Sequence, residues 1–316
     1  MKILVTGGAG FIGSHLVERL LKDNHEVVIF DTFETGSEIN IQNISSNSKL
    51  SIVNGSILDK TLLLEVSKDV DYIFHLAAAV GVLNIVRAPL KSLYTNIRGT
   101  ENVLEIADQF AIPVFLASSS EVYGKNNSTE LVEESDRLLG PTNILRWSYS
   151  QAKAIDESLA LAYKFETKLP VRIARFFNTV GPRQSGEYGM VIPRFISAAL
   201  SNKPITIYGT GNQTRCFIHV SDVVDAVMTI AFAENTIGEI YNIGNPIEIS
   251  ISDLAKKIIK MSNSSSEVKY SNYETMYGSS FEDMERRFPN VDKLRKLGWT
   301  PKRDLDYILK ELIDKN

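Results

Sequence analysis

The sequence has a single cysteine, Cys216, among its 316 residues. One thiol excludes a disulfide within the chain and any metal site built from several cysteines, so no bound metal is expected, and it suits the reducing cytoplasm. Long hydrophobic runs are also lacking: no stretch reaches the roughly 18 apolar residues that span a bilayer. The apolar start is broken by glycines and followed by His15, Glu18 and Arg19, which argues against a secretion signal. We therefore expect a soluble cytoplasmic protein with no membrane partner.

A surplus of basic residues is absent as well. Lys and Arg together number 34 against 38 Asp and Glu, for a formal net charge of −4, so nucleic acid is not an expected partner. Hydrophobic residues make up 44% of the chain, an ordinary value for globular proteins. The length allows a substantial core in one large domain or two closely joined ones.

Short apolar runs alternate with helical patterns through the first half. The runs at 2–7, 26–33, 50–56, 71–78 and 112–120 show little polar alternation, which is typical of strands covered on both faces. Helical spacing lies between them, with the longest segment over 90–110. This order predicts an α/β fold, a Rossmann-type doubly wound parallel sheet. After about residue 176 the pattern loosens, which predicts a smaller α/β C-terminal substrate domain. Residues 1–175 plus about 216–243 would form the first domain, and residues 176–215 plus 244–316 the second.

Three glycines, Gly7, Gly10 and Gly13, directly follow the first predicted strand and open a helical pattern that includes Phe11 and Ile12. Without Cβ atoms they allow a tight turn and let a pyrophosphate reach the N–H groups of the helix N-terminus. Glycines also serve close helix–strand packing, so it is the strand–glycine–helix order that favours dinucleotide binding.

Asp31 ends the second predicted strand, roughly 20 residues after the glycines. A carboxylate there can accept both ribose hydroxyls and repels a 2′-phosphate. An aspartate at a strand end can also have a purely structural role in the turn that follows. Since no arginine follows closely, the sequence favours NAD over NADP.

Tyr149 and Lys153 form a Y-x-x-x-K pair. On a helix they share one face, so the ammonium can lower the pKa of the phenol from about 10 toward neutrality and make it a general base or acid. Two surface residues match this spacing often by chance. Ser119, at the end of a predicted strand, can hydrogen-bond the same substrate hydroxyl, which favours a catalytic role.

These elements occur together with further runs in a fixed order: HLAA at 75–78, SSSEVYG at 118–124, RFFNTVGPR at 175–183 and TRCFIHVSDVV at 214–224. The chain resembles, over essentially its whole length, the extended short-chain dehydrogenases/reductases of the nucleotide-sugar epimerase/dehydratase/decarboxylase group. The resemblance implies a tightly bound NAD that is used and regenerated in each turnover, and a UDP-sugar substrate. Tyr149 would take the proton of the sugar C4 hydroxyl, Lys153 would hold the nicotinamide ribose, and Ser119 would orient the hydroxyl.

The resemblance assigns further positions to each ligand. On the cofactor side it implies Ser56, Ile57, Leu76, Ala77, Ala78 and Asn96, although relatives usually have an aspartate, which contacts adenine, in place of Ser56. On the substrate side it implies Asn178, Arg183, Val191, Arg194, Tyr208 and Arg215, with Arg215 gripping the diphosphate and Tyr208 against the base. Relatives usually dimerise through a four-helix bundle, here helices over 93–110 and 149–163, so a homodimer is expected.

Enzymes of this group make a 4-keto sugar, and the residues beside Ser119 distinguish how that intermediate reacts next. Ser120 and Glu121 resemble the Ser-Glu pair of UDP-glucuronate decarboxylases, and Arg287 falls on the arginine of an E-x-R-x-P segment in bacterial decarboxylases, which also have an Arg-Trp pair before the tyrosine. Arg287 would bind the C6 carboxylate or donate a proton. The expected reaction is decarboxylation of a UDP-hexuronic acid.

Three alternatives stay open at this point. A UDP-sugar 4-epimerase needs no further acid or base, and the run HLAAAVGV resembles epimerases more. A 4,6-dehydratase usually has Asp-Glu where this chain has Ser120 and Glu121. A non-catalytic dinucleotide-binding scaffold typically loses Tyr149 or Lys153, and both are present.

Overall fold

The computed structural model describes residues 1–81, 85, 87–186, 190–273, 282 and 284–315. Its strands are β1 (Lys2–Thr6), β2 (Glu26–Asp31), β3 (Leu50–Asn54), β4 (Tyr72–His75), β5 (Val114–Ser119), β6 (Val171–Phe176), β7 (Asn178–Val180), β8 (Ile205–Tyr208), β9 (Thr214–His219), β10 (Ile240–Ile243), β11 (Glu248–Ser250) and β12 (Val268–Ser271). Its helices are α1 (Phe11–Lys22), α2 (Glu38–Ile41), α3 (Lys60–Ser67), α5 (Pro89–Leu93), α6 (Gly99–Gln109), α7 (Ser148–Glu166), α8 (Val191–Leu200), α9 (Val220–Phe232), α10 (Ile251–Met261), α12 (Asp292–Arg295) and α13 (Leu305–Asp314).

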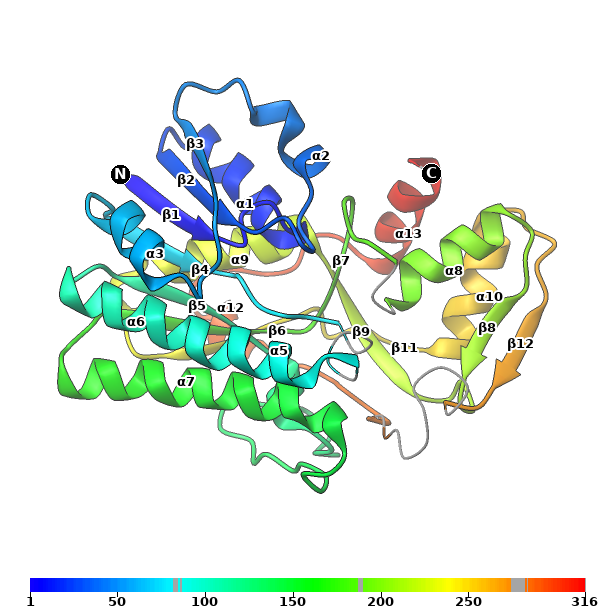
Figure 1. The fold of residues 1–316 in the computed structure, drawn as a ribbon. Helices are drawn as coiled ribbons and strands as arrows, with labels where there is room; N and C mark the ends of the chain where they lie inside the picture. The colour runs from blue at the N-terminus through cyan, green and yellow to red at the C-terminus, as the bar shows by residue number, and fades with distance from the viewer. Residues whose placement is uncertain (82–84, 86, 187–189, 274–281, 283, 316) are drawn as a thin grey trace.

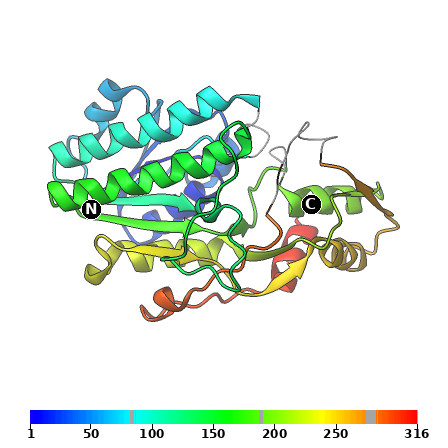
Figure 2. The ribbon, with the colours of Figure 1, turned by 90° about the horizontal axis from the view of Figure 1, so that it is seen from below.

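Seven of the strands form one parallel sheet, in the order β10-β6-β5-β4-β1-β2-β3. Successive side chains of a strand point to opposite faces. Thus Ile3 and Val5 join the core beneath α1 and α9, while Leu4 joins the core beneath α3, α6 and α7. Figure 2 shows α6 and α7 on one side of the sheet and α9 on the other. The predicted Rossmann-type doubly wound sheet is confirmed.

The second part of the chain forms a smaller α/β unit (Figure 1). Its core gathers apolar side chains of α8, α10 and α13 with those of β7, β8 and β9. Strand β9 pairs with β7 and β11, and β12 pairs with β8. The sequence-based division places residues 244–316 entirely in this unit, whereas Val291, Leu294 and Trp299 pack in the core beneath α1 and α9. The tail therefore returns to the Rossmann sheet. No helix within the described ranges is long and apolar enough to cross a membrane.

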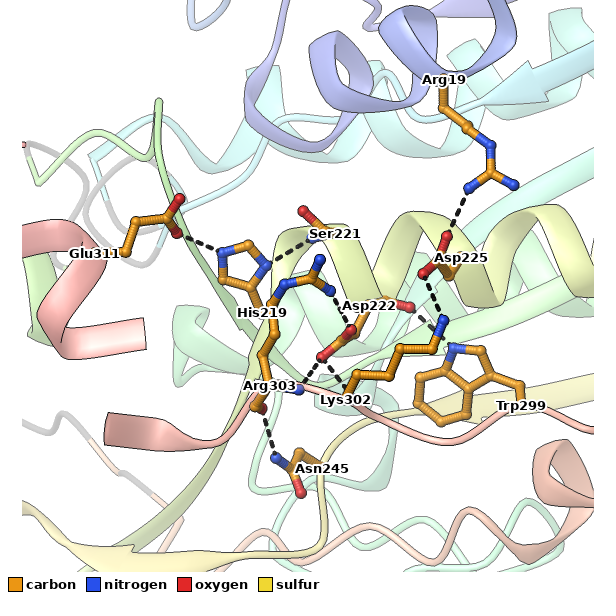
Figure 3. A network of polar contacts seen from close by, with 10 residues as sticks. All are labelled: Arg19, His219, Ser221, Asp222, Asp225, Asn245, Trp299, Lys302, Arg303 and Glu311. Carbon is orange, nitrogen blue, oxygen red and sulfur yellow. Dashed lines mark hydrogen bonds and ion pairs between the residues drawn. The ribbon is translucent and has the colours of Figure 1, made fainter. Parts of the chain in front are cut away.

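The C-terminal tail is fixed to α9 by a buried polar network (Figure 3). Asp222, 1% exposed, accepts backbone hydrogen bonds from Lys302 (3.1 Å) and Arg303 (3.0 Å) and pairs with the Arg303 guanidinium at 2.6 Å. Trp299 donates to the Asp222 carbonyl at 3.1 Å. On the preceding strand, His219 pairs with Glu311 of α13 at 2.8 Å. Because Asp222, His219 and Trp299 are buried, these contacts hold the tail against the core of the fold.

We expect Asp222→Asn to lower the free energy of unfolding by about 2 kcal/mol, because the buried carboxylate accepts from two backbone N–H groups and the Arg303 guanidinium, and the amide removes its charge. Urea unfolding followed by circular dichroism measures this. Asp225→Asn, one turn along the same helix, is the matched control: its carboxylate is 28% exposed and pairs with Arg19, so a loss below about 1 kcal/mol is expected. Equal losses for the two variants would contradict the anchoring role of Asp222.

Candidate active site

One cavity of about 1300 Å³ is lined by both parts of the fold. It receives nearly all the residues that the sequence predicts for the site. On the cofactor side these are Gly7, Gly10, Phe11, Ile12, Gly13, Asp31, Ser56, Ile57, Leu76, Ala77 and Ala78. The catalytic candidates are Ser119, Ser120, Glu121, Tyr149, Lys153 and Arg287, and the substrate candidates are Asn178, Arg183, Val191, Arg194, Tyr208 and Arg215. Residues as distant in sequence as Gly7 and Arg287 thus border one continuous space.

The glycine turn packs closely on the backbone and opens helix α1 at the cavity wall. Gly7 has φ +73°, and a Cβ there would lie 2.8 Å from the backbone nitrogen of Ala77. A Cβ on Gly13 would collide with the carbonyl oxygen of Gly7. Helix α1 begins after Gly10 with no capping side chain and no acidic residue in its first turn. Its N-terminal N–H groups and positive dipole end are therefore suited to the pyrophosphate of NAD.

Asp31 lies at the carboxyl end of β2, beside this turn. Its oxygens accept hydrogen bonds from the backbone N–H groups of Ala9 and Phe33, both at 2.9 Å. Burial raises the pKa of Asp31, and those two hydrogen bonds oppose the rise. A carboxylate has about four acceptor sites, so capacity remains for ribose hydroxyls. Together with the glycine turn, Asp31 makes this end of the cavity a fit for NAD.

Asn96 lies behind the cavity wall, although the sequence predicts it as a cofactor contact. It is 1% exposed and belongs to a π-helical turn, Tyr94–Arg98, between α5 and α6. Its side-chain oxygen accepts from the Ala79 N–H at 2.8 Å, and its NH₂ donates to the Ala79 carbonyl at 3.3 Å. π-Turns are frequent at functional sites. Here the turn lets Asn96 fix the loop that carries Ala77 and Ala78.

Ser119 and Tyr149 meet at the centre of the cavity, where β5 ends and α7 begins. Tyr149 is 9% exposed, and the Ser119 hydroxyl beside it acts to lower the pKa of its phenol. The Lys153 ammonium, 2% exposed, donates to the Ala117 carbonyl and to Asp156 Oδ2, each at 3.1 Å. Both α7 side chains line the cavity, as the Y-x-x-x-K spacing predicts.

The pKa of Tyr149 is shifted opposite to the expected direction. Burial raises it well above the usual value, and the negative charges of Glu121 and Asp156 raise it further. The Ser119 hydrogen bond and the charge of Arg287 act the other way. The Lys153 ammonium donates to Asp156 and to the Ala117 carbonyl, so burial and the two carboxylates dominate the pKa of the phenol.

Glu121 stands between two buried arginines. Its carboxylate accepts from Arg146 Nη1 and Arg287 Nη2, each at 2.7 Å, while Arg287 Nη1 donates to Ser120 Oγ at 3.3 Å. Both guanidinium side chains are about 5% exposed. Burial alone would raise the pKa of Glu121, but the two arginines outweigh it and hold the pKa well below its usual range. Glu121 is therefore an anion that fixes two cations at the cavity.

Arg287 is also close to Arg215. Burial lowers the pKa of Arg287, Glu121 raises it, and the positive charges of Arg215 and Arg146 lower it further. Its Nε is buried without a hydrogen-bond partner in the part of the chain that the structure describes. Two guanidiniums thus contact the Glu121 carboxylate and the charge of a third, Arg215, acts on Arg287, so this end of the cavity favours an anionic ligand.

The remaining substrate candidates lie farther along the cavity. The Arg194 guanidinium stacks on the Tyr208 ring at 4.8 Å and donates to the Thr206 carbonyl. Asn178 donates to the Cys216 carbonyl at 3.1 Å. Arg183 instead reaches α1, where it donates to Ser14 and pairs with Glu18 at 2.5 Å. This position places Arg183 at the cofactor helix and away from the sugar end.

Sequence reasoning gave no role to two residues of the site. Arg146 belongs to the Arg-Trp pair before Tyr149, which could have marked it as a site residue. Its contact with Glu121 could not be predicted, because it joins segments 25 residues apart. Asp156 lies one turn from Lys153 on α7, and no motif marks it. Among the described residues, no group of three or more His, Cys, Asp or Glu could hold a metal ion.

Comparisons with known proteins agree with this geometry. The sequence profile of the NAD dependent epimerase/dehydratase family matches residues 3–244. The chain is 43% identical over 297 residues to UDP-N-acetyl-alpha-D-glucosaminuronate decarboxylase of Bacillus cytotoxicus, covering 94% of this chain and 91% of that protein. It is 35% identical over 303 residues to UDP-glucuronic acid decarboxylase 1 of Xenopus tropicalis, covering 95% and 68%.

Among solved structures, a variant of UDP-glucuronic acid 4-epimerase from Bacillus cereus, in complex with NAD and UDP-4-deoxy-4-fluoro-glucuronic acid, is 30% identical with a TM-score of 0.90. The match covers 99% of this chain and 98% of that one. The glycine turn, Asp31, Tyr149 and Lys153 thus belong to an enzyme whose cofactor is NAD, and the chain is a member of the NAD dependent epimerase/dehydratase family.

Proposed function

We propose that this enzyme decarboxylates a UDP-hexuronic acid through a 4-keto intermediate. The observation that carries the proposal is the buried Arg146–Glu121–Arg287 cluster beside Ser119 and Tyr149. The two guanidiniums and the one carboxylate carry a net charge of +1. This charge suits a substrate with a carboxylate on C6, whereas a neutral hydroxymethyl group on C6 gives it no partner. The 43% identity to a UDP-N-acetyl-glucosaminuronate decarboxylase supports the same reaction.

NAD, when bound, supplies the reversible oxidation of the sugar at C4. The residues of the chain handle the protons and charges. Tyr149, as phenolate, takes the proton of the C4 hydroxyl at its phenol oxygen, and Ser119 orients that hydroxyl. The resulting β-keto acid loses CO₂ when the C5–C6 bond breaks and its electrons form an enolate between C5 and C4. Arg146 and Arg287 hold the carboxylate and then stabilise the enolate until C5 takes up a proton. Glu121 acts by fixing the two arginines, since its low pKa keeps it ionised.

A UDP-glucuronic acid 4-epimerase is the second candidate. The structural similarity to such an enzyme favours it, and an arginine cluster would bind its C6 carboxylate equally well. That reaction needs only Ser119, Tyr149 and Lys153 for the chemistry. The two candidates differ in the fate of the C5–C6 bond.

The purified enzyme should therefore be incubated separately with UDP-glucuronic acid, UDP-N-acetylglucosaminuronic acid, UDP-glucose and UDP-N-acetylglucosamine. Release of CO₂ with a UDP-pentose or its 2-acetamido counterpart is expected from one or both acids. A C4 epimer of an acid, without CO₂, would establish the second candidate. Turnover of the neutral sugars alone would overturn the argument from the arginine cluster.

We further infer that the enzyme is a cytoplasmic homodimer paired through α6 and α7. Supporting this, the two helices lie side by side along one face of the molecule (Figure 1), and Ile155 (43%) and Phe165 (76%) of α7 are large exposed apolar side chains. A single buried thiol, Cys216, suits a reducing compartment. A single-chain mass in sedimentation equilibrium would contradict the dimer.

A further inference from the structure

The cofactor end of the cavity is bridged by an ion pair. Lys91 Nζ of α5 lies 2.7 Å from Glu34 Oε2, in the segment that follows β2 and Asp31. Both side chains line the cavity, yet that of Lys91 is 61% exposed and that of Glu34 is 58% exposed. Side chains that line a cavity and are more than half exposed stand at its mouth. The pair therefore joins the segment after β2 to α5 where the cavity meets solvent.

The segment that carries Glu34 is fixed to the glycine turn. The carbonyl of Ala9 accepts hydrogen bonds from the Ser37 N–H at 3.1 Å and from the Asn40 side chain at 2.9 Å. The Ala9 N–H donates to Asp31 at 2.9 Å. Glu34 thus extends from a wall that is held beside the predicted pyrophosphate site.

The helix that carries Lys91 is fixed to the glycine turn by a second route. Asn96, in the π-helical turn after α5, makes two hydrogen bonds with Ala79. Two residues before Ala79, the backbone of Ala77 lies so close to Gly7 that a Cβ on Gly7 would be 2.8 Å from the Ala77 nitrogen. The two routes start at one turn and meet at the ion pair.

These contacts form a closed ring along the cavity wall. Its cavity-lining members are Gly7, Glu34, Ala77, Ala79 and Lys91. The links at Ala9 and at Asn96 are buried or half-buried, whereas the Lys91–Glu34 pair is exposed. An exposed ion pair is weak and is screened by salt. Among these links, the ion pair is therefore the one that opens most readily.

Ser92, next to Lys91, indicates that a polar ligand lies against α5. Its side chain lines the cavity and is 3% exposed, and its Oγ has no hydrogen-bond partner in the described part of the chain. A buried hydroxyl without a partner costs free energy, and a ligand in the cavity can supply that partner. Because Asp31 and the glycine turn make this end a fit for NAD, the ligand expected beside α5 is NAD.

We propose that the Lys91–Glu34 ion pair is a clasp over the cofactor: it holds α5 to the segment after β2, and NAD leaves the protein when the pair opens. The clasp concerns retention of the cofactor and does not depend on which sugar is the substrate. It gives two exposed side chains, which otherwise resemble any surface ion pair, a role in the NAD site.

The test is the rate at which the cofactor leaves. Protein loaded with NADH is mixed with an excess of NAD, and the loss of bound-NADH fluorescence is followed. Lys91→Met should speed release about threefold, the size expected for one exposed ion pair. Lys60→Met is the matched control, because Lys60 forms a comparably exposed pair with Glu105 at 2.6 Å and neither belongs to the cavity wall as described. It should release NADH at the wild-type rate.

Glu34→Gln separates a clasp from a direct attraction of Lys91 to the phosphates of the cofactor. Removing the negative charge of Glu34 would strengthen such an attraction and slow release, whereas breaking a clasp speeds release about threefold. The double variant Glu34→Gln with Lys91→Met should be no faster than either single variant, because both remove one interaction. Glu34→Lys combined with Lys91→Glu should return the rate toward that of the wild type.

Salt gives an independent measurement. Between about 0.05 and 0.5 M NaCl the release rate of the wild type and of Lys60→Met should rise more steeply than that of Lys91→Met, because salt screens the clasp. A Lys91→Met protein with the wild-type rate, a Glu34→Gln protein that releases NADH more slowly, or equal salt dependence in all variants would overturn the proposal. No arm uses a sugar, so a failure here is distinct from a failure of the proposed decarboxylation.

Discussion

Tyr149→Phe is expected to reduce turnover of every substrate by about 10³-fold, because it removes the phenol oxygen that takes the C4 proton in the proposed reaction. Tyr149 lines the cavity together with Ser119 and Lys153. The ring itself stays, so the packing of a side chain that is only 9% exposed should change little. Rates of CO₂ release under saturating substrate measure the effect.

Binding should survive this substitution. Calorimetry with UDP-glucuronic acid is expected to give an affinity near that of the wild type, which makes the loss one of kcat. Tyr163→Phe on the same helix is the matched control and should retain full turnover, because Tyr163 packs in the core beneath α3, α6 and α7, remote from the cavity wall. A Tyr149→Phe enzyme that keeps a tenth of its activity would show that another group accepts the proton.

Arg287→Lys is expected to slow CO₂ release by about 100-fold, because one ammonium cannot replace the guanidinium that contacts Ser120 and Glu121 together. Arg286→Lys is the control: this neighbour pairs with Glu248 and is 35% exposed, and its substitution should leave the rate near the wild type. Equal rates of CO₂ release from the two variants would show that Arg287 has no role in the reaction.

Glu121→Gln should have a similar effect on CO₂ release and a larger one on stability. It leaves two buried guanidiniums without their counter-ion, which we expect to lower the free energy of unfolding by about 3 kcal/mol. Because the arginines hold the pKa of Glu121 far below neutrality, the wild-type pH profile should show no step from Glu121 between pH 5 and 9. A variant that releases CO₂ at the wild-type rate, or unfolds as the wild type does, would contradict this role.

The sequence was most informative where structure is local. A strand, three glycines and a helix are consecutive, so β1, the turn and α1 can be predicted from spacing, and Asp31 from the end of β2. Tyr149 and Lys153 share a face because they are four residues apart on one helix. Each of these features depends on contacts within one βα unit or one turn.

The features that sequence reasoning missed depend on distant contacts or burial. Arg146 meets Glu121 only because the segment before α7 folds back over β5, and Asp156 looks like any helical aspartate until its zero exposure is known. The pKa of Tyr149 also depends on burial. The spacing from Lys153 predicts a lowered pKa, whereas burial raises it. Asn96 was assigned to the cofactor by resemblance, and in the structure its amide oxygen and its NH₂ each make a hydrogen bond with Ala79.

Arg287 follows the glycine turn, Asp31 and Tyr149 in the chain, so its part of the active site is made last during synthesis. A ribosome adds about 5–20 residues per second, so the glycine turn, Asp31 and Tyr149 emerge well before the tail that carries Arg287. Strand β10, the edge strand of the Rossmann sheet beside β6, also precedes that tail. The Rossmann sheet can therefore form around the dinucleotide site first. The carboxylate-binding cluster is completed only when the tail returns and Asp222 fixes it at Lys302 and Arg303.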